Sequence, residues 1–183
     1  MNSLKERFFK KVIPDWQSEF KEKNILAIPR PKKIVVNMGI GWAKDDPKLV
    51  ERARTELSAI CGQWPAITRA RKAEASFKLK AGDPIGLVVS LRGEKLWGFF
   101  SKLIEVALPR VRDFRGLSRG AFDNSGNYNL GLTEQTIFPE IDPNKTDRVK
   151  SLGITIVMSS GSVQRSFRLL QMLGMPFQKE VNK

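Results

Sequence analysis

The sequence contains no histidine and only one cysteine, Cys61, among its 183 residues. The missing histidine removes the commonest general base of enzymes and the commonest protein ligand of transition metals. A single cysteine cannot form a disulfide within the chain, and its place near Leu57 and Ile60 on an expected helix face predicts a core thiol. These absences disfavour an enzyme, leaving carboxylate or lysine catalysis as the alternative, and we expect a protein that is not an enzyme and that uses no metal and no cofactor.

Long apolar runs are also missing. No stretch reaches the roughly 18 to 20 apolar residues that a membrane-spanning helix needs. Residues 1–11 are charged and lack the apolar segment of a secretory signal. We therefore expect a soluble protein that is neither secreted nor membrane-spanning.

Acidic residues are scarce relative to basic ones: 19 Asp and Glu stand against 32 Lys and Arg, a formal net charge of +13. Such an excess favours a polyanionic partner, because the summed positive field and the release of counterions both drive binding. Nucleic acid and an anionic membrane surface are the two large candidates, and a basic surface kept for solubility alone is the third reading. The charge narrows the class of partner but does not choose among these.

The apolar fraction of 41% is that of a folded globular protein. The length fits one domain over residues 1–183, with an N-terminal helical segment at 1–28, a core at 29–177 and a tail at 178–183. Apolar residues spaced three and four apart predict four helices, the first of which Pro14 should kink or split. The expected helices cover Leu4–Phe20, Asp46–Gly62, Leu96–Ala107 and Ser162–Gly174.

Alternating or continuous apolar patterns predict the strands. The expected strands are Ile34–Met38, Ala75–Lys80, Ile85–Leu91 and Ile154–Met158, the middle two forming an antiparallel hairpin around the turn Ala81–Pro84. Between helix and strand, Val111–Tyr128 reads as a long irregular segment. The predicted fold class is α+β: an antiparallel or mixed β-sheet with α-helices packed on one face, an N-terminal helical extension and long basic loops.

One motif favours an enzyme. A strand followed by Gly39-Ile40-Gly41 and a helix resembles the start of a dinucleotide-binding unit. However, Lys44 stands where the third glycine belongs, and the carboxylates of Asp45 and Asp46 would repel a pyrophosphate at the helix N-terminus. A nucleotide-dependent enzyme therefore stays only as a rival hypothesis. Capping and turn roles account better for the neighbouring acids Asp45-Asp46 and for Glu140 with Asp142.

Basic residues cluster at loops and strand ends. Guanidinium groups match phosphate oxygens and stack on unpaired bases, so arginine in irregular, glycine-containing chain is typical of RNA recognition. A solvated loop is the alternative. For Trp42, Trp64 and Trp97, packing in the core or in an interface is favoured over stacking on bases. The two clusters contain Arg69, Arg71, Lys72, Lys78 and Lys80, and then Arg110, Arg112, Arg115 and Arg119.

The chain resembles a known family over nearly its whole length, from Leu4 to Phe177. The family is ribosomal large-subunit protein family five, of the bacterial and organellar type, whose members bind 5S ribosomal RNA in the central protuberance. The resemblance rests on an ordered series of motifs. These are PKKIVVNMGIG at 31–41, GQWP at 62–65, ITRARK at 67–72, SFKLK at 76–80, PIG at 84–86, LRG at 91–93, ALPRVRDFRG at 107–116, FD at 122–123, GNYNLG at 126–131, EQ at 134–135, IFPEI at 137–141 and GMPF at 174–177.

The resemblance implies a structural constituent of the large ribosomal subunit that fixes 5S RNA. It implies a place in cytoplasmic ribosomes of the bacterial type, with an organellar ribosome as the alternative, and no membrane partner. It further implies contact with large-subunit RNA, peptidyl-site transfer RNA, neighbouring large-subunit proteins and a protein of the small-subunit head, to which the family forms an intersubunit bridge. The implied 5S-binding residues are Lys32, Lys33, Asn37, Gly39, Gln63, Ser90 and Arg92. The implied loop facing transfer RNA carries Arg69, Arg71, Lys72, Ser76, Lys78 and Lys80. Other RNA or bridge contacts fall on Arg110, Arg112, Arg115 and Asn127.

The sequence departs from the family pattern at a few positions. Ser90 stands where threonine is common, which keeps the hydroxyl group. Trp64 and Trp97 replace the usual lysine and tyrosine, and the segment 142–150, whose family counterpart helps to form the intersubunit bridge, differs as well.

A basic module outside the ribosome that binds any RNA is the remaining alternative, and it predicts equal affinity for 5S RNA and for an unrelated structured RNA. The charge and glycine content of 69–82 and 113–127 predict that both stretches are mobile when the protein is free.

Overall fold

A computed structural model describes residues 3–178 of the chain, so most of the expected tail at 178–183 lies outside the described residues. The chain divides into two compact units. The first unit comprises Met1–Ile34, Arg92–Leu130 and Thr155–Lys183, and the second comprises Val35–Leu91 and Gly131–Ile154. Strands β1, β4 and β5 each have residues in both units, because the chain crosses from one unit to the other within them.

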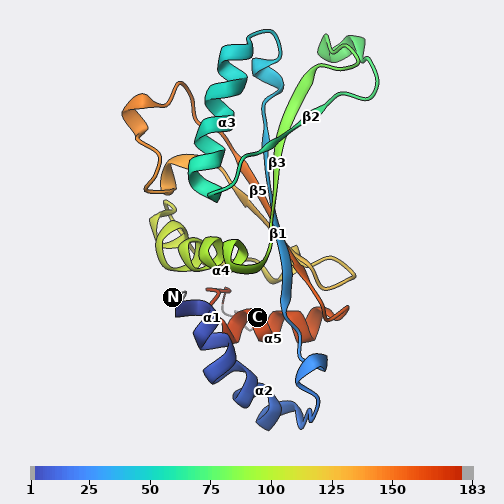
Figure 1. The fold of residues 1–183 in the computed structure, drawn as a ribbon, viewed down its shortest axis with the longest axis vertical. Coiled ribbons are helices and arrows are strands. Elements are labelled where there is room, and N and C mark those ends of the chain that lie inside the picture. Colours follow the sequence, from blue (N-terminus) through green and yellow to red (C-terminus); the bar gives the residue numbers. More distant parts are fainter. Residues whose placement is uncertain (1–2, 179–183) are drawn as a thin grey trace. The chain divides into compact units, whose positions relative to one another are not determined.

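A single five-stranded sheet runs through the fold in the order β2-β3-β1-β5-β4 (Figure 1). It is open and antiparallel, and together with the helices it confirms the α+β class. The strands are β1 Pro31–Gly39, β2 Ala66–Arg69, β3 Pro84–Leu91, β4 Tyr128–Leu132 and β5 Leu152–Met158. Strands β1, β3 and β5 confirm the sequence prediction, whereas β4 was missed: only its first residue, Tyr128, lies in the expected irregular segment, and no element was predicted for 129–132.

The strands have one buried side and one exposed side, as their period of two requires. In β1 the side chains of Ile34, Val36 and Met38 are fully buried, whereas Asn37 and Gly39 between and after them are exposed. Strands β3 and β5 follow the same alternation. The exposed side of the sheet therefore carries polar and small residues such as Asn37, Gly39 and Ser90, together with apolar residues that are only partly covered, such as Val35 and Ile85.

In the second unit, helix α3, Pro47–Cys61, begins and ends where the sequence predicts. The Asp46 carboxylate accepts a hydrogen bond from the backbone N–H of Lys48, and Gly62 ends the helix in the left-handed region at φ 64°. Cys61, near the end of α3, is only 5% exposed, which confirms the core thiol. The helix thus presents one apolar side to the core and leaves Gly62 and the residue after it at the surface.

The predicted hairpin was wrong in one strand. The partner of β3 is β2, with Ala66 opposite Val88 and Thr68 opposite Gly86, and a register shift interrupts the ladder between Thr68 and Arg69. The expected strand Ala75–Lys80 is instead a loop tip, in which Ala75–Phe77 forms a 3-10 turn. Its alternating pattern predicted a strand wrongly because the apolar phase is not buried against the core: Phe77 is 77% exposed and Leu79 is only half-buried.

In the first unit the N-terminal helix is continuous rather than split at Pro14. Its α-helical parts are joined by a π-helical turn, which accommodates Pro14 near the start of the second part. Leu4, Phe8, Val12 and Trp16 are buried as predicted, but Phe20 is 42% exposed. The helices of this unit are α1 Ser3–Arg7, π-helical Phe8–Val12, α2 Ile13–Phe20, α4 Gly93–Lys102 with π-helical Leu103–Ala107, and α5 Val163–Met172.

Short 3-10 turns complete the fold. They lie at Ile25–Ala27, Gly41–Ala43, Ala75–Phe77, Leu108–Arg110, Arg119–Ala121, Gln135–Ile137 and Pro143–Lys145. Within the described residues, no helix combines the length and the apolar character needed to cross a bilayer. The same part of the chain holds no group of three or more Cys, Asp and Glu side chains arranged to bind a metal ion.

The only tyrosine of the chain, Tyr128, gives the first unit a pH-dependent stability. Its ring is 1% exposed, its hydroxyl donates to the carbonyl oxygen of Ser118 at 3.0 Å, and burial raises its pKa to about 12. The raised pKa means that the folded state holds the proton that the unfolded state loses near pH 10. We expect full stability below pH 10 and a loss of roughly 1.4 kcal/mol per pH unit between about pH 10 and 12.

A titration of tyrosinate absorbance reports this residue alone, because no second tyrosine contributes. The expected result is a midpoint near the onset of alkaline unfolding, with Tyr128→Phe removing the absorbance change and most of the pH dependence between 10 and 12. A tyrosinate midpoint near the ordinary value of about pH 10, in a protein that stays folded, would contradict the burial of Tyr128.

Candidate RNA-binding surfaces

The exposed side of the sheet in the second unit brings together three polar side chains that are far apart in the sequence. Asn37 and Ser90 are exposed on β1 and β3, and Gln63 follows α3 directly after the left-handed Gly62. The Gln63 side-chain amide donates to the backbone carbonyl of Ser90 at 3.3 Å. This hydrogen bond fixes the glutamine side chain beside the end of β3.

Small residues keep this surface open. A Cβ atom on Gly153 of β5 would lie 3.5 Å from Oδ1 of Asn37, and one on Gly86 would lie 2.7 Å from the Thr68 hydroxyl oxygen. Because the glycines have no side chain, the Asn37 amide and the Thr68 hydroxyl are left uncovered. Amides and hydroxyls both donate and accept, so the surface suits ribose 2′-hydroxyls and base edges. Gly39 is also exposed, at the end of β1.

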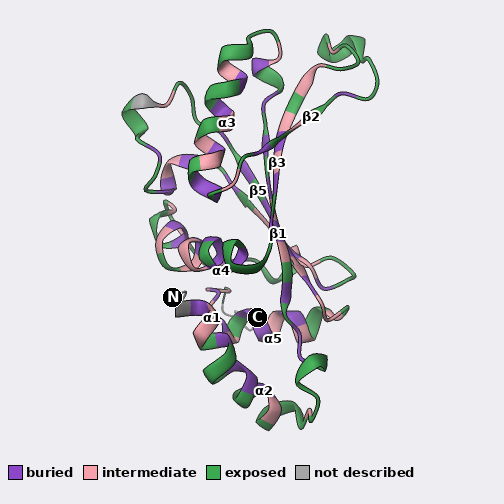
Figure 2. Ribbon diagram, in the orientation of Figure 1, coloured by how far each residue is buried: buried purple, intermediate pink, exposed green. Residues whose placement is uncertain are grey.

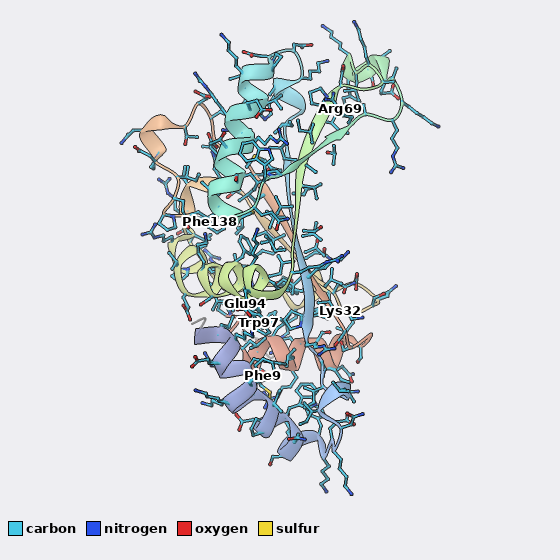
Figure 3. The ribbon with its side chains drawn as sticks, in the orientation of Figure 1. Phe9, Lys32, Arg69, Glu94, Trp97 and Phe138 are labelled. Carbon is cyan, nitrogen blue, oxygen red and sulfur yellow. The ribbon has the colours of Figure 1, made fainter. Side chains whose placement is uncertain are left out.

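The basic residues expected to accompany this surface belong to the first unit. Lys32 and Arg92 are exposed and Lys33 is half-buried. Lys32 and Lys33 lie at the start of β1 (Lys32 is labelled in Figure 3), and Arg92 is the residue that precedes α4. The seven expected 5S-binding residues thus divide into four of the second unit and three of the first.

The loop Arg69–Gly82 extends beyond the ends of β2 and β3, and Figure 2 shows it almost entirely exposed. Its base is closed by backbone hydrogen bonds from Ala70 to the Asp83 carbonyl at 2.8 Å and from Gly82 to the Ala70 carbonyl at 2.9 Å. The Arg69 guanidinium, labelled in Figure 3, donates to the Gly82 carbonyl at 2.9 Å. Arg69 therefore holds the base of the loop together.

The tip of this loop has a defined shape. Glu74 and Leu79 exchange backbone hydrogen bonds, and the Lys44 ammonium reaches the backbone carbonyls of Phe77 and Lys78. Ser76 donates to the Glu74 carboxylate at 3.1 Å. The remaining cationic side chains project into solvent and are available to phosphates; they are Arg71, Lys72, Lys78 and Lys80.

The arginine-rich segment after α4 divides into two kinds of residue. Arg110, Arg112, Arg115 and Arg119 are all exposed, and the Arg119 guanidinium in addition lies over the Phe167 ring at 4.7 Å from its centroid. The first three can meet phosphates. Arg119 differs from them because its guanidinium also stacks on Phe167 of α5.

Asn127 is occupied by the fold. Its side-chain amide donates to Asp123 at 2.8 Å and its oxygen accepts from the Met158 backbone at 3.0 Å. Hydrogen bonds from the Asn127 side chain and backbone lower the pKa of Asp123, so that turn is held by an ionised carboxylate. The Asn127 side chain therefore joins the turn at Asp123 to the end of β5, and it offers few free polar atoms to a ligand.

The tryptophans differ in exposure. Trp97 is 8% exposed and packs against Phe8 with ring centroids 5.3 Å apart, as expected of a core residue. Trp42 and Trp64 are 37% and 54% exposed, and each is covered on one face by an arginine, Arg148 or Arg54, at 4.9 and 4.7 Å from the ring centroid. Neither exposed ring offers a bare stacking face on both sides.

A groove of about 720 Å³ in the second unit is unsuited to RNA. It lies between the outer side of α3 and the segment 140–146, and four carboxylates and two cations line it. Phosphate would be repelled there. The ionisable lining residues are Lys48, Glu51, Arg52, Glu56, Glu140 and Asp142.

Sequence reasoning missed Thr68, Gly86 and Gly153 on the exposed side of the sheet. The signal was present for the two glycines: each falls on the polar phase of a strand, where an unexplained glycine indicates close approach of a ligand or another backbone. Thr68 carried no such signal, because β2 itself was placed wrongly.

Comparison with protein families gives a match over most of the chain. Residues 24–80 match the model described as Ribosomal protein L5, and residues 84–177 match the model described as the C-terminus of the same ribosomal family. Among curated relatives, the large ribosomal subunit proteins uL5 of Chloroflexus aggregans and Chloroflexus aurantiacus are each 49% identical over 174 residues, covering 95% of this chain and 97% of the relative. The uL5 protein of a Thermoanaerobacter species is 47% identical over 98% of this chain and its own full length.

Proposed function

The chain belongs to the ribosomal protein L5 family, and from this premise we propose that it attaches 5S ribosomal RNA to the large subunit through the exposed side of its sheet. The chain is a structural constituent of the large ribosomal subunit that serves translation, and it is not an enzyme. What remains to be assigned is which of its surfaces meets which partner.

The observation that carries the proposal is the uncovered polar surface of the second unit. Asn37 and Ser90 are exposed, the Gln63 amide is fixed on the Ser90 carbonyl at 3.3 Å, and Gly153 leaves the Asn37 amide open. These groups can read 2′-hydroxyls and base edges, while Lys32, Lys33 and Arg92 neutralise phosphates. Specificity then comes from the amides, and affinity comes largely from the cations.

Removing either amide is expected to weaken binding to 5S RNA. Asn37→Ala and Gln63→Ala each delete one side of a hydrogen-bonded contact, which should raise Kd about fivefold to thirtyfold, or roughly 1 to 2 kcal/mol. The measurement is a binding titration of the purified chain against 5S RNA and an RNA of equal length, over a series of salt concentrations. With about six phosphates neutralised, log affinity should fall with log salt at a slope of roughly −4 to −5.

Asn144→Ala is the matched control, since it removes an exposed amide of the same unit in the Pro143–Lys145 turn. It should leave the affinity for 5S RNA unchanged. Equal binding of the wild-type chain to both RNAs would refute 5S recognition. Preference for 5S RNA that survives both amide substitutions would place the site elsewhere on the chain.

The second part of the proposal assigns the loop Arg69–Gly82 to peptidyl-site transfer RNA. The triple variant Arg71→Ala, Lys72→Ala and Lys80→Ala should keep the fold and 5S binding, because these side chains are exposed at the loop tip. In ribosomes reconstituted with the variant, transfer RNA should dissociate from the peptidyl site about tenfold faster, since three phosphate contacts are lost. Neutralising Lys11, Lys23 and Lys48, three exposed lysines outside the loop, should have no such effect. Equal dissociation rates for the two triple variants would rule out the loop.

The remaining exposed surfaces fit the other partners that the family implies. Arg110, Arg112 and Arg115 are free to meet large-subunit RNA. The segment 142–150, with its acidic groove against α3, suits a basic protein of the small-subunit head better than it suits RNA. Contacts with neighbouring large-subunit proteins are assigned to no particular residues.

A further inference from the structure

Three exposed apolar side chains surround one hollow of the first unit, which has a volume of about 260 Å³. Phe9 in the N-terminal helix and Ile25 and Leu26 in the following 3-10 turn are 55%, 55% and 76% exposed. Trp97 of α4, only 8% exposed, also lines the hollow; Figure 3 labels Phe9 and Trp97 on their two elements. Exposed apolar side chains gathered at one hollow indicate a contact surface more strongly than scattered ones do.

The fold holds these side chains in place. The Asn24 side chain accepts a hydrogen bond from the Leu26 backbone N–H at 2.9 Å, and Arg165 of α5 donates to the Ala27 carbonyl at 3.3 Å. Phe9 packs edge-on against Phe8, with centroids 5.2 Å apart. The apolar groups are therefore exposed by a defined structure, and binding would need little ordering of the protein.

The charges at the hollow select an anionic ligand. Arg30 and Lys5 line it, and no carboxylate is among its lining residues, although Glu94 pairs with Lys5 from outside. Arg30 stands between Pro29 and Pro31, which fix the backbone on both sides, and its side chain is exposed. An aromatic ring beside a guanidinium is the combination that holds an unpaired nucleobase and its phosphate.

The size of the hollow favours RNA over protein as the ligand. A protein partner needs roughly 1,200 Å² or more of buried surface, whereas one base needs only a small ring-lined slot. A volume of about 260 Å³ accommodates a single planar ring system rather than a docked helix. The chain also runs directly from Arg30 and Pro31 into Lys32 and Lys33, which are assigned to 5S RNA above.

We infer that this hollow receives one unpaired base of 5S ribosomal RNA, which stacks on Phe9 against Leu26 and Ile25 while Arg30 binds an adjacent phosphate. The inference rests on the proposed binding to 5S RNA. It adds a second anchoring point in the first unit, which differs in chemistry from the amide surface because it depends on stacking rather than on base-edge hydrogen bonds.

The test combines affinity with chemical probing of 5S RNA bound to the full chain. Phe9→Ala should raise Kd about fivefold to thirtyfold, the range expected for loss of one stacked base. The Kd of Phe9→Leu should lie between those of wild type and Phe9→Ala. One unpaired base that wild type shields from dimethyl sulfate should become reactive with Phe9→Ala, while the rest of the footprint stays. Arg30→Gln should weaken binding more than Lys23→Gln, which removes one exposed charge outside the hollow.

Val163→Ala controls for loss of an exposed apolar side chain, because Val163 is 39% exposed on α5 and does not line the hollow. Thermal unfolding should show that all variants stay folded. If wild type prefers 5S RNA and Phe9→Ala, Leu26→Ala and Arg30→Gln bind it within twofold with the same footprint, the inference is wrong while the proposed function stands. A photocrosslinker at position 9 that captures protein instead of RNA in the assembled subunit would also overturn it. If wild type shows no preference for 5S RNA, the proposed function and this inference both fail.

Discussion

Replacing Glu56 by leucine is expected to lower the free energy of unfolding by about 3 to 5 kcal/mol. The Lys150 ammonium lies 2.8 and 2.9 Å from the two Glu56 carboxylate oxygens, and the Lys150 side chain is only 1% exposed. Trp42 approaches the same ammonium, with its ring centroid 5.8 Å away. Removing the carboxylate leaves a buried cation without an anion, which is the most destabilising change that this pair allows. Urea unfolding measures the effect.

Two further variants separate this charge effect from loss of side-chain packing. Glu51→Leu, on the same helix, breaks an exposed pair with Arg54 at 3.2 Å and should change stability by less than about 1 kcal/mol. The double variant Glu56→Leu with Lys150→Met removes both buried charges and should recover most of the loss. A double variant as unstable as Glu56→Leu alone would show that the side chains, and not their charges, matter.

Gly153→Val should abolish most of the affinity for 5S RNA while leaving the fold intact. A Cβ at position 153 meets only the Asn37 side chain at ordinary contact distance, and valine is favoured in strands, so β5 tolerates the change. The added methyl groups would cover the Asn37 amide and hold an RNA backbone away from the sheet. We expect Kd to rise at least about thirtyfold, or about 2 kcal/mol, in the same salt-series titration.

Gly131→Val is the graded control for this prediction. Gly131 is also exposed, on the edge strand β4, and a Cβ there would meet no atom within 4 Å. Strand β5 separates it from β1, so it should weaken binding much less than Gly153→Val does. Equal losses for both variants would mean that the RNA lies across the whole exposed side, and no loss for either would exclude this side of the sheet.

The local signals in the sequence were sufficient for the elements that carry their own start and stop residues. Helix α3 was predictable because Asp46, Pro47 and Gly62 define its two ends. Strand β1 was predictable because a continuous apolar run precedes a glycine. In contrast, Ala75–Lys80 alternates like a strand but makes only an isolated bridge between Glu74 and Leu79. Alternation shows that a segment could form an amphipathic strand, and it does not show that a partner strand is present.

The surfaces depend on contacts that local patterns do not contain. Gln63 and Ser90 are 27 positions apart, and only the fold makes them neighbours. Their assignment came from the family resemblance and not from spacing. Lys150 lies in a charged linker whose composition favours exposure to solvent. Yet the whole residue is only 3% exposed, with its ammonium bonded to Glu56 and its backbone N–H bonded to the Gln135 side chain. Burial of a charged residue is a property of the tertiary structure, so composition could not predict it.

The register shift between Thr68 and Arg69 places an irregular step in the β2–β3 ladder directly before the loop Arg69–Gly82. Pairing of β2 with β3 resumes beyond the shift at Arg69 and Pro84, and hydrogen bonds from the Arg69 guanidinium and the Ala70 backbone close the base of the loop. The shape of the tip is meanwhile maintained by its own hydrogen bonds. Such an irregularity increases the local twist of a strand and re-aims the chain beyond it, so it sets the direction in which the cationic tip leaves the sheet.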